Sequence, residues 1–427
     1  MPKRSYRKLR VLILILVICF VAIQFIRPGL DNAPVTADLK APPPVKAVLQ
    51  RACYDCHSNE TKLLWFDQLA PAYWLVVEDV KEGRKALNFS GWDSLPKAQQ
   101  AARLFESIFQ IEQQAMPLSQ YKLLHHGAAL SPEDLAVLKD YALTMSYQAR
   151  PDTAREQAWK LQQGLWRTAA ATPLNVANEY NGISYGPLAG FANWTVVSTT
   201  ERYDNGTLRL ILGNDVVVKA IREGHTDPWP DGSIFAKVAW DQLADTSGEI
   251  RTGAFKQVEF MIRDQEKYAS TFGWGWARWV GGLSMKPYGK DASFVTECMN
   301  CHRPLDKTDH TFTFPLADTQ TVTRKVITTF INRKDSTMST LYGNDIAVQN
   351  ARNGQPYGAG AVVSLVTWLQ REDPHWFGGR IPGALSSIEI LRFSGADTLS
   401  SIEHQAGKNL TKRTDYSFTG RSAAVMP

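Results

Sequence analysis

The sequence predicts an α+β protein that is helical in its first third and built from antiparallel strands with flanking helices in the remainder. Three observations predict this fold class. Apolar residues recur at helical spacing through residues 45–149, most clearly in 97–114. From about Tyr180 the chain changes to runs rich in β-branched and aromatic residues. The strand pattern then returns once more towards the C-terminus, which indicates an internal repeat.

A membrane anchor is predicted at the N-terminus. Residues 11–26 are apolar apart from Gln24, include Cys19, and would form a helix about 24 Å long at 1.5 Å per residue. Arginines at both ends can reach the lipid headgroups, and the basic tail should stay in the cytoplasm. The sequence therefore predicts a single-pass inner-membrane protein, with residues 1–27 as tail and anchor and the body in the periplasm. A cleaved signal peptide is the alternative, and it would deliver the body to the same compartment.

Charge outside the N-terminal tail is balanced. The chain carries a net charge of +5, and the tail accounts for that excess. A neutral body argues against nucleic acid or an anionic surface as the main partner. The basic residues of the tail are Lys3, Arg4, Arg7, Lys8 and Arg10.

A C-x-x-C-H motif occurs twice and uses all but one of the 5 cysteines. The motif is typical of covalently attached c-type haem. Thiols three positions apart on a short helix can both reach the vinyl groups at one edge of a porphyrin, and the next histidine presents its imidazole to the iron. Half a zinc site or a thiol redox pair is the alternative, but each would need the following histidine by chance, twice. The motifs are Cys53, Cys56 and His57, and Cys298, Cys301 and His302.

Residues 45–149 are predicted to form a small helical domain around the first haem, after a proline-rich linker at 28–44. A haem that only carries electrons needs a second axial ligand. Met116 is the expected one, because the proline that follows it can stiffen a loop that holds the thioether at the iron. A core role is the alternative for Met116. The competing ligands are His125 and His126, for which a surface pair is the simpler interpretation.

Several short segments of this domain resemble a family of small periplasmic haem-binding domains. In that family a methionine before proline lies where the distal ligand is expected, which implies this role for Met116. The residues that carry the resemblance are 53–61, 70–71, 81–84, 87–90, Met116 with Pro117, Tyr121 and 130–131.

Residues 150–179 are predicted to be a helical connector, and 180–315 a domain of strands that carries the second motif on a helix. Asn214 is expected to cap a short helix at 216–223. The predicted strands lie at 194–200, 207–212, 233–240, 257–262 and 275–280.

The strand at 209–212, the turn at 229–232 before Lys237, the segment 258–264 and the second C-x-x-C-H motif occur in order. In this respect residues 180–315 resemble cytochrome P-460 and its relative cytochrome c-prime-beta. In the P-460 family the lysine after the turn is bonded to the haem ring, and an arginine and a carboxylate line the open face of the iron. The resemblance implies these roles for Lys237, Arg209 and Glu259.

Residues 316–427 are predicted to be a degenerate repeat of the preceding domain without haem. Segment 212–216 returns as 342–346 and segment 228–242 as 356–370, with no C-x-x-C-H motif afterwards. The two repeats are expected to pack together as a pseudo-dimer.

The repeat also serves as an internal control for the implied site residues. Lys237 corresponds to Leu365 and Arg209 to Ser339, so both polar groups are missing where the haem motif is missing. This supports haem-directed roles for them. Glu259 corresponds to Glu389, so a structural role is the alternative for its carboxylate.

Together these features predict a membrane-anchored dihaem c-type cytochrome with two covalently attached haems. No methionine–proline pair follows His302 nearby, so the second iron is expected to keep an open site for a small molecule. By resemblance the substrate is hydroxylamine or nitric oxide, with electrons passing to the N-terminal haem and then to a partner cytochrome. The alternatives are a non-catalytic nitric-oxide sensor or scavenger, and plain electron transfer, with peroxidase-like use of the open haem as a variant.

Overall fold

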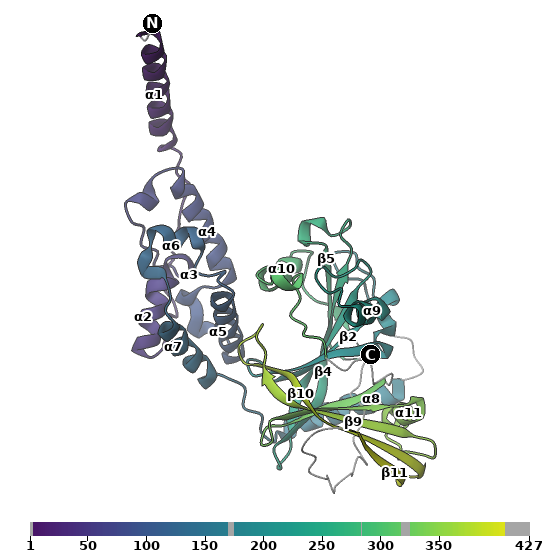
Figure 1. Cartoon of the computed structure of the whole chain (residues 1–427). Coiled ribbons are helices and arrows are strands. Elements are labelled where there is room, and N and C mark those ends of the chain that lie inside the picture. The colour runs from purple at the N-terminus through teal and green to yellow at the C-terminus, as the bar shows by residue number, and fades with distance from the viewer. Residues whose placement is uncertain (1–2, 170–174, 283, 317–324, 406–427) are drawn as a thin grey trace. The chain divides into compact units, whose positions relative to one another are not determined.

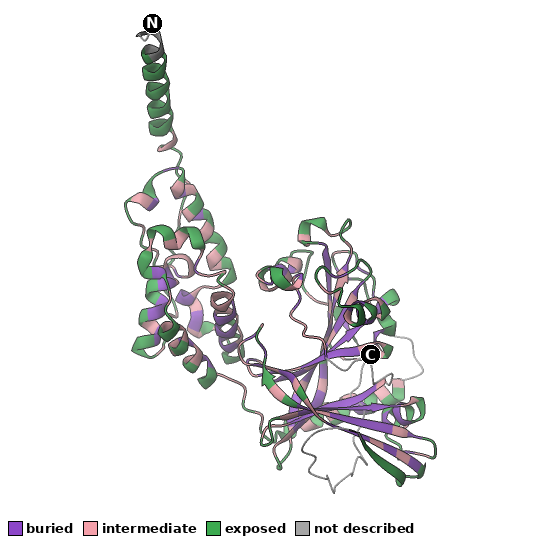
Figure 2. Ribbon diagram, in the orientation of Figure 1, coloured by how far each residue is buried: buried purple, intermediate pink, exposed green. Residues whose placement is uncertain are grey.

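A computed structural model describes the chain except for residues 1–2, 170–174, 283, 317–324 and 406–427 (Figure 1). The chain forms two compact units, Met1–Met145 and Ser146–Pro427. Each unit contains buried residues, which are purple in Figure 2. The combination of helices with an antiparallel sheet confirms the predicted α+β class.

The first unit is a helical domain. Leu104, Phe105, Ile108 and Phe109 of α5 are almost completely buried, and their spacing forms the apolar stripe of an amphipathic helix. Its elements are α1 (Lys3–Ile23), α2 (Pro43–Ala52), α3 (Tyr54–His57), η1 (Phe66–Gln68), α4 (Ala72–Ala86), η2 (Phe89–Ser94), α5 (Lys97–Glu112), α6 (Ser119–Leu124), η3 (His126–Ala128) and α7 (Pro132–Thr144).

The predicted membrane anchor is wrong. In the part of the chain that the structure describes, no helix combines the length and the apolar character needed to cross a membrane. Helix α1 ends at Ile23, and its uncharged part begins only at Val11. That part rises about 20 Å, against about 30 Å of hydrocarbon in a bilayer. The predicted run extended to residue 26, but the side chain of Gln24 bonds instead to the backbone of Ala70. The single-pass inner-membrane localisation therefore does not hold.

The second unit is built on one antiparallel sheet of 11 strands. The strand order is β3-β2-β1-β10-β9-β8-β7-β4-β5-β6; β4 also pairs with β3, so the path closes on itself, and β11 pairs with β10. The strands are β1 (Thr195–Arg202), β2 (Thr207–Gly213), β3 (Ile234–Ala244), β4 (Glu249–Arg263), β5 (Trp274–Val280), β6 (Lys286–Pro287), β7 (Lys325–Asn332), β8 (Thr337–Gly343), β9 (Val362–Glu372), β10 (Gly379–Gly395) and β11 (Thr398–Gln405). The helices are α8 (Thr153–Ala169), η4 (Gly186–Asn193), α9 (Asp215–Glu223), η5 (Ala269–Thr271), α10 (Phe294–His302), η6 (Asp306–Thr308) and α11 (Asp345–Asn353).

This sheet consists of two parts with the same order of elements, which is strand, strand, helix, strand, strand. We call residues 180–315 the first half and residues 325–405 the second half. Strand β1 pairs with β10, and β7 pairs with β4. Each half thus joins its first strand to the fourth strand of the other, which is the reciprocal pairing of a two-fold dimer.

Helix α8 lies against the first half. The Gln162 side chain donates to the carbonyl of Phe255 over 3.1 Å and accepts from its N–H over 2.6 Å. Arg251 of β4 also donates to Glu156 over 3.0 Å. The predicted connector helix is therefore bonded to the sheet of the second unit.

The two faces of the first half differ in what they pack against. Val238, Val258 and Trp279 point into the main apolar core. On the other face Phe235 and Trp276 pack with helices α9 and α10. Side chains two positions apart on a strand point to the same face. Residues two positions from Phe235 and Trp276 therefore lie on the face that carries α9 and α10.

Candidate haem-binding sites

The first C-x-x-C-H motif lies at the junction of α2 and α3. Its histidine points Nδ1 at the carbonyl of Gly83 over 2.9 Å and at that of Leu87 over 3.2 Å. Nδ1 must therefore carry the proton, which leaves Nε2 as a lone-pair donor for a metal. Burial lowers the pKa of His57, so the ring is neutral and competent as a ligand.

Helix α4 approaches the backbone of this motif closely at Gly83. A Cβ atom there would lie 2.8 Å from the carbonyl oxygen of Cys56, which is too close for any other residue. The sequence resemblance included Gly83, but nothing in the spacing of residues gave its role. The close approach is what brings the Gly83 carbonyl to His57.

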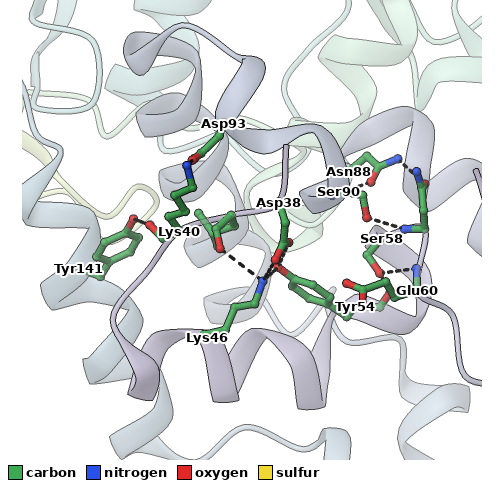
Figure 3. A network of polar contacts seen from close by, with 12 residues as sticks. Asp38, Lys40, Lys46, Tyr54, Ser58, Glu60, Asn88, Ser90, Asp93 and Tyr141 are labelled. Atoms are coloured by element: carbon green, nitrogen blue, oxygen red, sulfur yellow. Dashed lines mark hydrogen bonds and ion pairs between the residues drawn. The ribbon is translucent and has the colours of Figure 1, made fainter. Parts of the chain in front are cut away.

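A polar network fixes the other side of the motif (Figure 3). Tyr54, buried within the motif, donates to Asp38 over 2.9 Å and stacks on Phe89. Lys46 forms an ion pair with the same aspartate. Ser58 accepts from Glu60 N–H over 2.9 Å, and the segment is tied to η2 where Asn59 N–H donates to Ser90 over 2.8 Å. The motif is thus held rigidly from both sides.

The predicted distal ligands of the first haem differ in their surroundings. Both ring nitrogens of His125 are engaged, one with Asp67 over 3.0 Å and one with the Tyr121 carbonyl over 3.1 Å. His126 is exposed. Met116 is partly buried between α5 and α6. The following helix, α6, is tied to the motif because Tyr121 donates to Asp55 over 2.7 Å. Of the three side chains, Met116 is therefore the one that is partly buried and takes no part in these bonds.

The second motif lies on α10. His302 donates from Nδ1 to the carbonyl of His310 over 2.7 Å, which again leaves Nε2 for a metal. The carbonyl is brought there by a bend in which Asp309 and His310 have φ of 47° and 63°. Burial lowers the pKa of His302 to about 3. The imidazole packs between Trp276, at 4.3 Å, and the edge of Phe312, at 4.8 Å between ring centroids.

A row of charged side chains crosses the sheet next to this histidine. Lys237, Glu259 and Arg278 are direct neighbours on β3, β4 and β5, so they share one face. Lys237 Nζ lies 2.6 Å from Glu259 Oε2, and Arg278 Nε lies 3.5 Å from Glu259 Oε1. Gln257 also donates to this carboxylate. We call Lys237, Glu259 and Arg278 the charged row.

The position of the row beside α10 follows from the register. Phe235, Met261 and Trp276 form the adjacent row on the same face, and they pack against Cys298 and its neighbours in α10. Arg209 lies two residues before Ile211, whose partner across the sheet is Lys237, so Arg209 is on this face too. The sequence-predicted Lys237, Arg209 and Glu259 are therefore brought to one face of the sheet beside the second motif.

The charges of the row control one another. Burial opposes ionisation of Glu259, but Arg278 and Lys237 outweigh it and hold the pKa of this carboxyl well below its usual range. Burial lowers the pKa of Lys237, although Glu259 opposes the shift. Burial also lowers the pKa of Arg209 to about 10. At neutral pH the row therefore holds an ionised carboxylate between cations.

The residues around both motifs fit a haem. Burial raises the pKa of Cys53, Cys56 and Cys298 to about 12, whereas a redox pair relies on thiols with a depressed pKa. Beside His302, the buried Trp276 Nε1 and Arg278 Nε have no hydrogen-bond partner among the described residues. Such groups suit a polar ligand that lies over this face.

Arg278 and Trp276 were missed by reasoning from sequence. Both lie on the predicted strand at 275–280, where alternation places them on one face. Alternation could therefore have shown that the two side chains share a face. It could not have shown that this is the face of Glu259, because that depends on how β4 pairs with β5. A third neighbour, Glu297 of α10, lies 3.8 Å from Arg278 and accepts from Tyr288 over 3.0 Å.

In the second half, the positions that correspond to the charged row carry different residue types. Leu365 pairs with Glu389 as Lys237 pairs with Glu259, and His404 takes the place of Arg278. Ser339 and Thr367 share a hydrogen bond of 2.9 Å where Arg209 and Ala239 lie in the first half. Glu389 is buried, and its Oε2 has no hydrogen-bond partner among the described residues.

Two histidines, each following a pair of cysteines and each with Nδ1 held by a backbone carbonyl, define a haem-binding cytochrome. Comparison with protein-family models agrees with this class: residues 18–144 match the haem-binding domain, and residues 188–313 match cytochrome P460. The two matches follow one another along the chain in the order that the sequence predicted. The second match ends before the second half begins. No curated protein matches the chain.

Proposed function

We propose that this protein is a dihaem c-type cytochrome that oxidises a small nitrogen compound, hydroxylamine or nitric oxide, at the haem held by Cys298, Cys301 and His302. The haem held by Cys53, Cys56 and His57 receives the electrons and passes them to a partner cytochrome. The observation that supports the proposal is the charged row beside His302, because a carboxylate between cations would suit a small ligand that exchanges protons at this face.

The chain's own residues would hold and deprotonate the substrate, while the bound iron would supply the electron transfer. Oxidation of hydroxylamine releases protons together with electrons, and Glu259 is the carboxylate placed to accept them. Arg209 and Arg278 would donate hydrogen bonds to a bound oxygen or nitrogen atom. The Nε of Arg278 supports this role, because it lies in an ion pair with Glu259 but makes no hydrogen bond among the described residues.

Lys237 would be bonded to the haem ring, as the family resemblance implies. The N–C bond would replace an N–H and a ring C–H bond, so it requires an oxidant such as hydrogen peroxide to take up the electrons. It would also remove the ammonium charge that lies 2.6 Å from Glu259. Loss of that charge raises the pKa of the carboxyl and makes it a better proton acceptor.

At the first haem we propose that Met116 would be the second residue, with His57, to hold the iron. Helix α6, which follows its loop, is bonded to the motif through Tyr121 and Asp55. A closed iron changes little on reduction and suits electron transfer, and methionine ligation raises the reduction potential.

We also propose that the second half is a copy of the P460 domain that carries no haem. It has the same order of elements as the first half, but Leu365 and Ser339 stand where Lys237 and Arg209 stand.

The test is production of the full chain in a host that attaches c-type haem. A mass increase equal to two haems is expected, with a red-shifted Soret band and turnover of hydroxylamine. Lys237→Leu, which copies the residue of the second half, should abolish the shifted band. Lys256→Leu is the matched control, because Lys256 is on β4 outside the charged row and pairs with Asp241. An ordinary c-type spectrum that Lys237→Leu leaves unchanged would contradict the role of Lys237.

A non-catalytic nitric-oxide-binding cytochrome is a second candidate. The observation that favours it is the full engagement of Glu259 by Lys237, Arg278 and Gln257, which weakens it as a base. Tight nitric-oxide binding by the reduced protein without turnover of hydroxylamine would decide for this candidate.

A further inference from the structure

We propose that the second half positions the axial histidine of the first half, through Trp376 and His375 in the loop between β9 and β10. This inference rests on ligation of a haem iron by His302, as proposed above. It gives the second half a role in the site, although that half has no C-x-x-C-H motif of its own.

The loop between the third and fourth strands differs in length between the two halves. In the first half β3 ends at Ala244 and β4 begins at Glu249. In the second half β9 ends at Glu372 and β10 begins at Gly379, so this loop is longer and contains both His375 and Trp376. The extra length is thus confined to the hairpin that carries these side chains.

The longer loop reaches the segment that follows the haem motif. His375 Nδ1 lies 3.1 Å from the carbonyl oxygen of Phe312 and can donate to it, and its ring stacks on Phe314 at 4.2 Å. The ring of Trp376 lies 6.0 Å from that of Phe312, at an interplanar angle of 62°. Backbone and side chain of Phe312 are therefore both held by the second half.

Phe312 transmits this contact to the axial ligand. Its ring stands at 90° to the imidazole of His302, with 4.8 Å between centroids. Trp276 packs against the imidazole at 4.3 Å. Rotation of the imidazole ring would displace the ring of Phe312. Phe312 resists that displacement because its ring also packs against Trp376.

Trp376 itself is fixed by a buried ion pair of the first half. The guanidinium of Arg202 lies 3.8 Å from the Trp376 ring centroid. Asp204 accepts two hydrogen bonds from this guanidinium, over 2.7 and 2.8 Å. The residue of the second half that corresponds to Arg202 is Asn332. The second half therefore has no guanidinium at this position to hold the corresponding loop of the first half.

The physical consequence concerns the strength of the bond between His302 and an iron. The hydrogen bond from Nδ1 to the His310 carbonyl makes the imidazole more electron-rich, and it requires a fixed ring orientation. If Phe312 loses its support, the ring is free to rotate and this hydrogen bond weakens. The iron–histidine bond should then weaken as well.

The experiment measures the iron–histidine stretching band by resonance Raman spectroscopy on the reduced, haem-loaded full chain. The band is assigned to His302 by its loss in His302→Ala. Trp376→Ala and His375→Ala should each move it to lower frequency and broaden it, and Trp376→Phe should restore most of the wild-type band. The control is Phe393→Leu, since Phe393 is as buried as Trp376, at 7% exposure, and lies in the separate core of the second half.

The outcomes separate the two proposals. A wild-type spectrum without a band that depends on His302 would overturn the proposed ligation. A band that is present but unmoved in the folded variants, or moved equally by Phe393→Leu, would overturn the positioning role alone. If Trp376→Ala does not fold, His375→Ala decides, because it removes one surface-side hydrogen bond and leaves the buried tryptophan in place.

Discussion

The two halves of the second unit share their framework and differ in their chemistry. In each half an asparagine caps the helix and also donates to a glycine carbonyl: Asn214 to Gly232 over 2.8 Å, and Asn344 to Gly360 over 2.9 Å. Each first strand has a bulge at the same place, between Val196 and Ser198 and between Val326 and Thr328. These features set the path of the chain, and they are present with or without a haem motif.

The differences are concentrated on one face. At equivalent registers the first half has Lys237 and Arg209 where the second has Leu365 and Ser339. The core on the opposite face of the sheet is apolar, and both halves contribute to it. The comparison teaches that residues of the shared framework occur in both halves, whereas Lys237 and Arg209, for which we propose roles at the haem, occur in the first half alone. Glu259 is the exception, because the predicted site residue has an identical counterpart, Glu389, in the second half.

The largest expected effect tests this exception. Glu259→Gln removes the proton acceptor and leaves two cations without their counter-charge, so hydroxylamine oxidation should fall by about 10²- to 10⁴-fold. Glu389→Gln, at the equivalent position, should leave the rate near that of the wild type. The measurement is the steady-state rate at equal haem content. Equal losses in both variants would mean that this carboxylate supports the fold in both halves.

The next effect concerns the junction between the halves. Glu201 of the first half is completely buried and is bound by Arg333 of the second half over 2.6 and 2.9 Å. Arg333→Ala leaves that carboxylate without its cation, so the free energy of unfolding should fall by about 3–5 kcal/mol. Denaturant unfolding measures the loss. Lys334→Ala, at the exposed neighbouring position, is the control, and a similar loss in both variants would contradict the assignment.

Much of the fold and part of the site follow from sequence patterns alone. The cysteine pairs and their histidines are local, so spacing is sufficient to find them. Lys237 and Glu259 were predicted as site residues from the resemblance, and the repeat supported Lys237 but left a structural role open for Glu259. The helix cap at Asn214 follows from the residue type and the apolar residues behind it.

The remainder depends on information that spacing does not carry. Arg278 joins the charged row only through the register of β4 with β5. Trp376 is far from His302 in sequence, and only the reciprocal pairing of the halves brings its loop to Phe312. The anchor prediction failed for a local reason: helix α1 ends at Ile23, and its apolar part is short without the residues that follow.

A third prediction concerns acid stability. The folded-state pKa of Glu259 is held below the ordinary value of about 4.3 by Arg278 and Lys237, and Arg278 keeps its charge even if Lys237 is bonded to the haem ring. A group with a lowered pKa stabilises the fold fully above its unfolded-state pKa, and that contribution is lost as the pH falls towards the folded-state pKa. Wild type should therefore lose about 2 kcal/mol of stability below about pH 4 that Glu259→Gln does not lose.

Unfolding midpoints of the two proteins between pH 5 and pH 2.5 check this expectation. Parallel pH profiles would show that Glu259 titrates alike in the folded and unfolded chains. Glu389→Gln provides the comparison with the second half, where Leu365 stands opposite the carboxylate instead of a lysine.

The smallest effect sharpens the comparison where the halves agree. Asn214 accepts a hydrogen bond from Val217 N–H over 3.1 Å, and Asn344 accepts one from Ala347 N–H over 3.0 Å. Alanine at either cap should lower the free energy of unfolding by about 1 kcal/mol, and the double variant should lose about the sum, because the caps share no partner. Thermal or denaturant unfolding measures the three losses. If only one of the two alanine variants lowers the free energy of unfolding, the two halves have the same backbone path but do not depend on the same hydrogen bonds for stability.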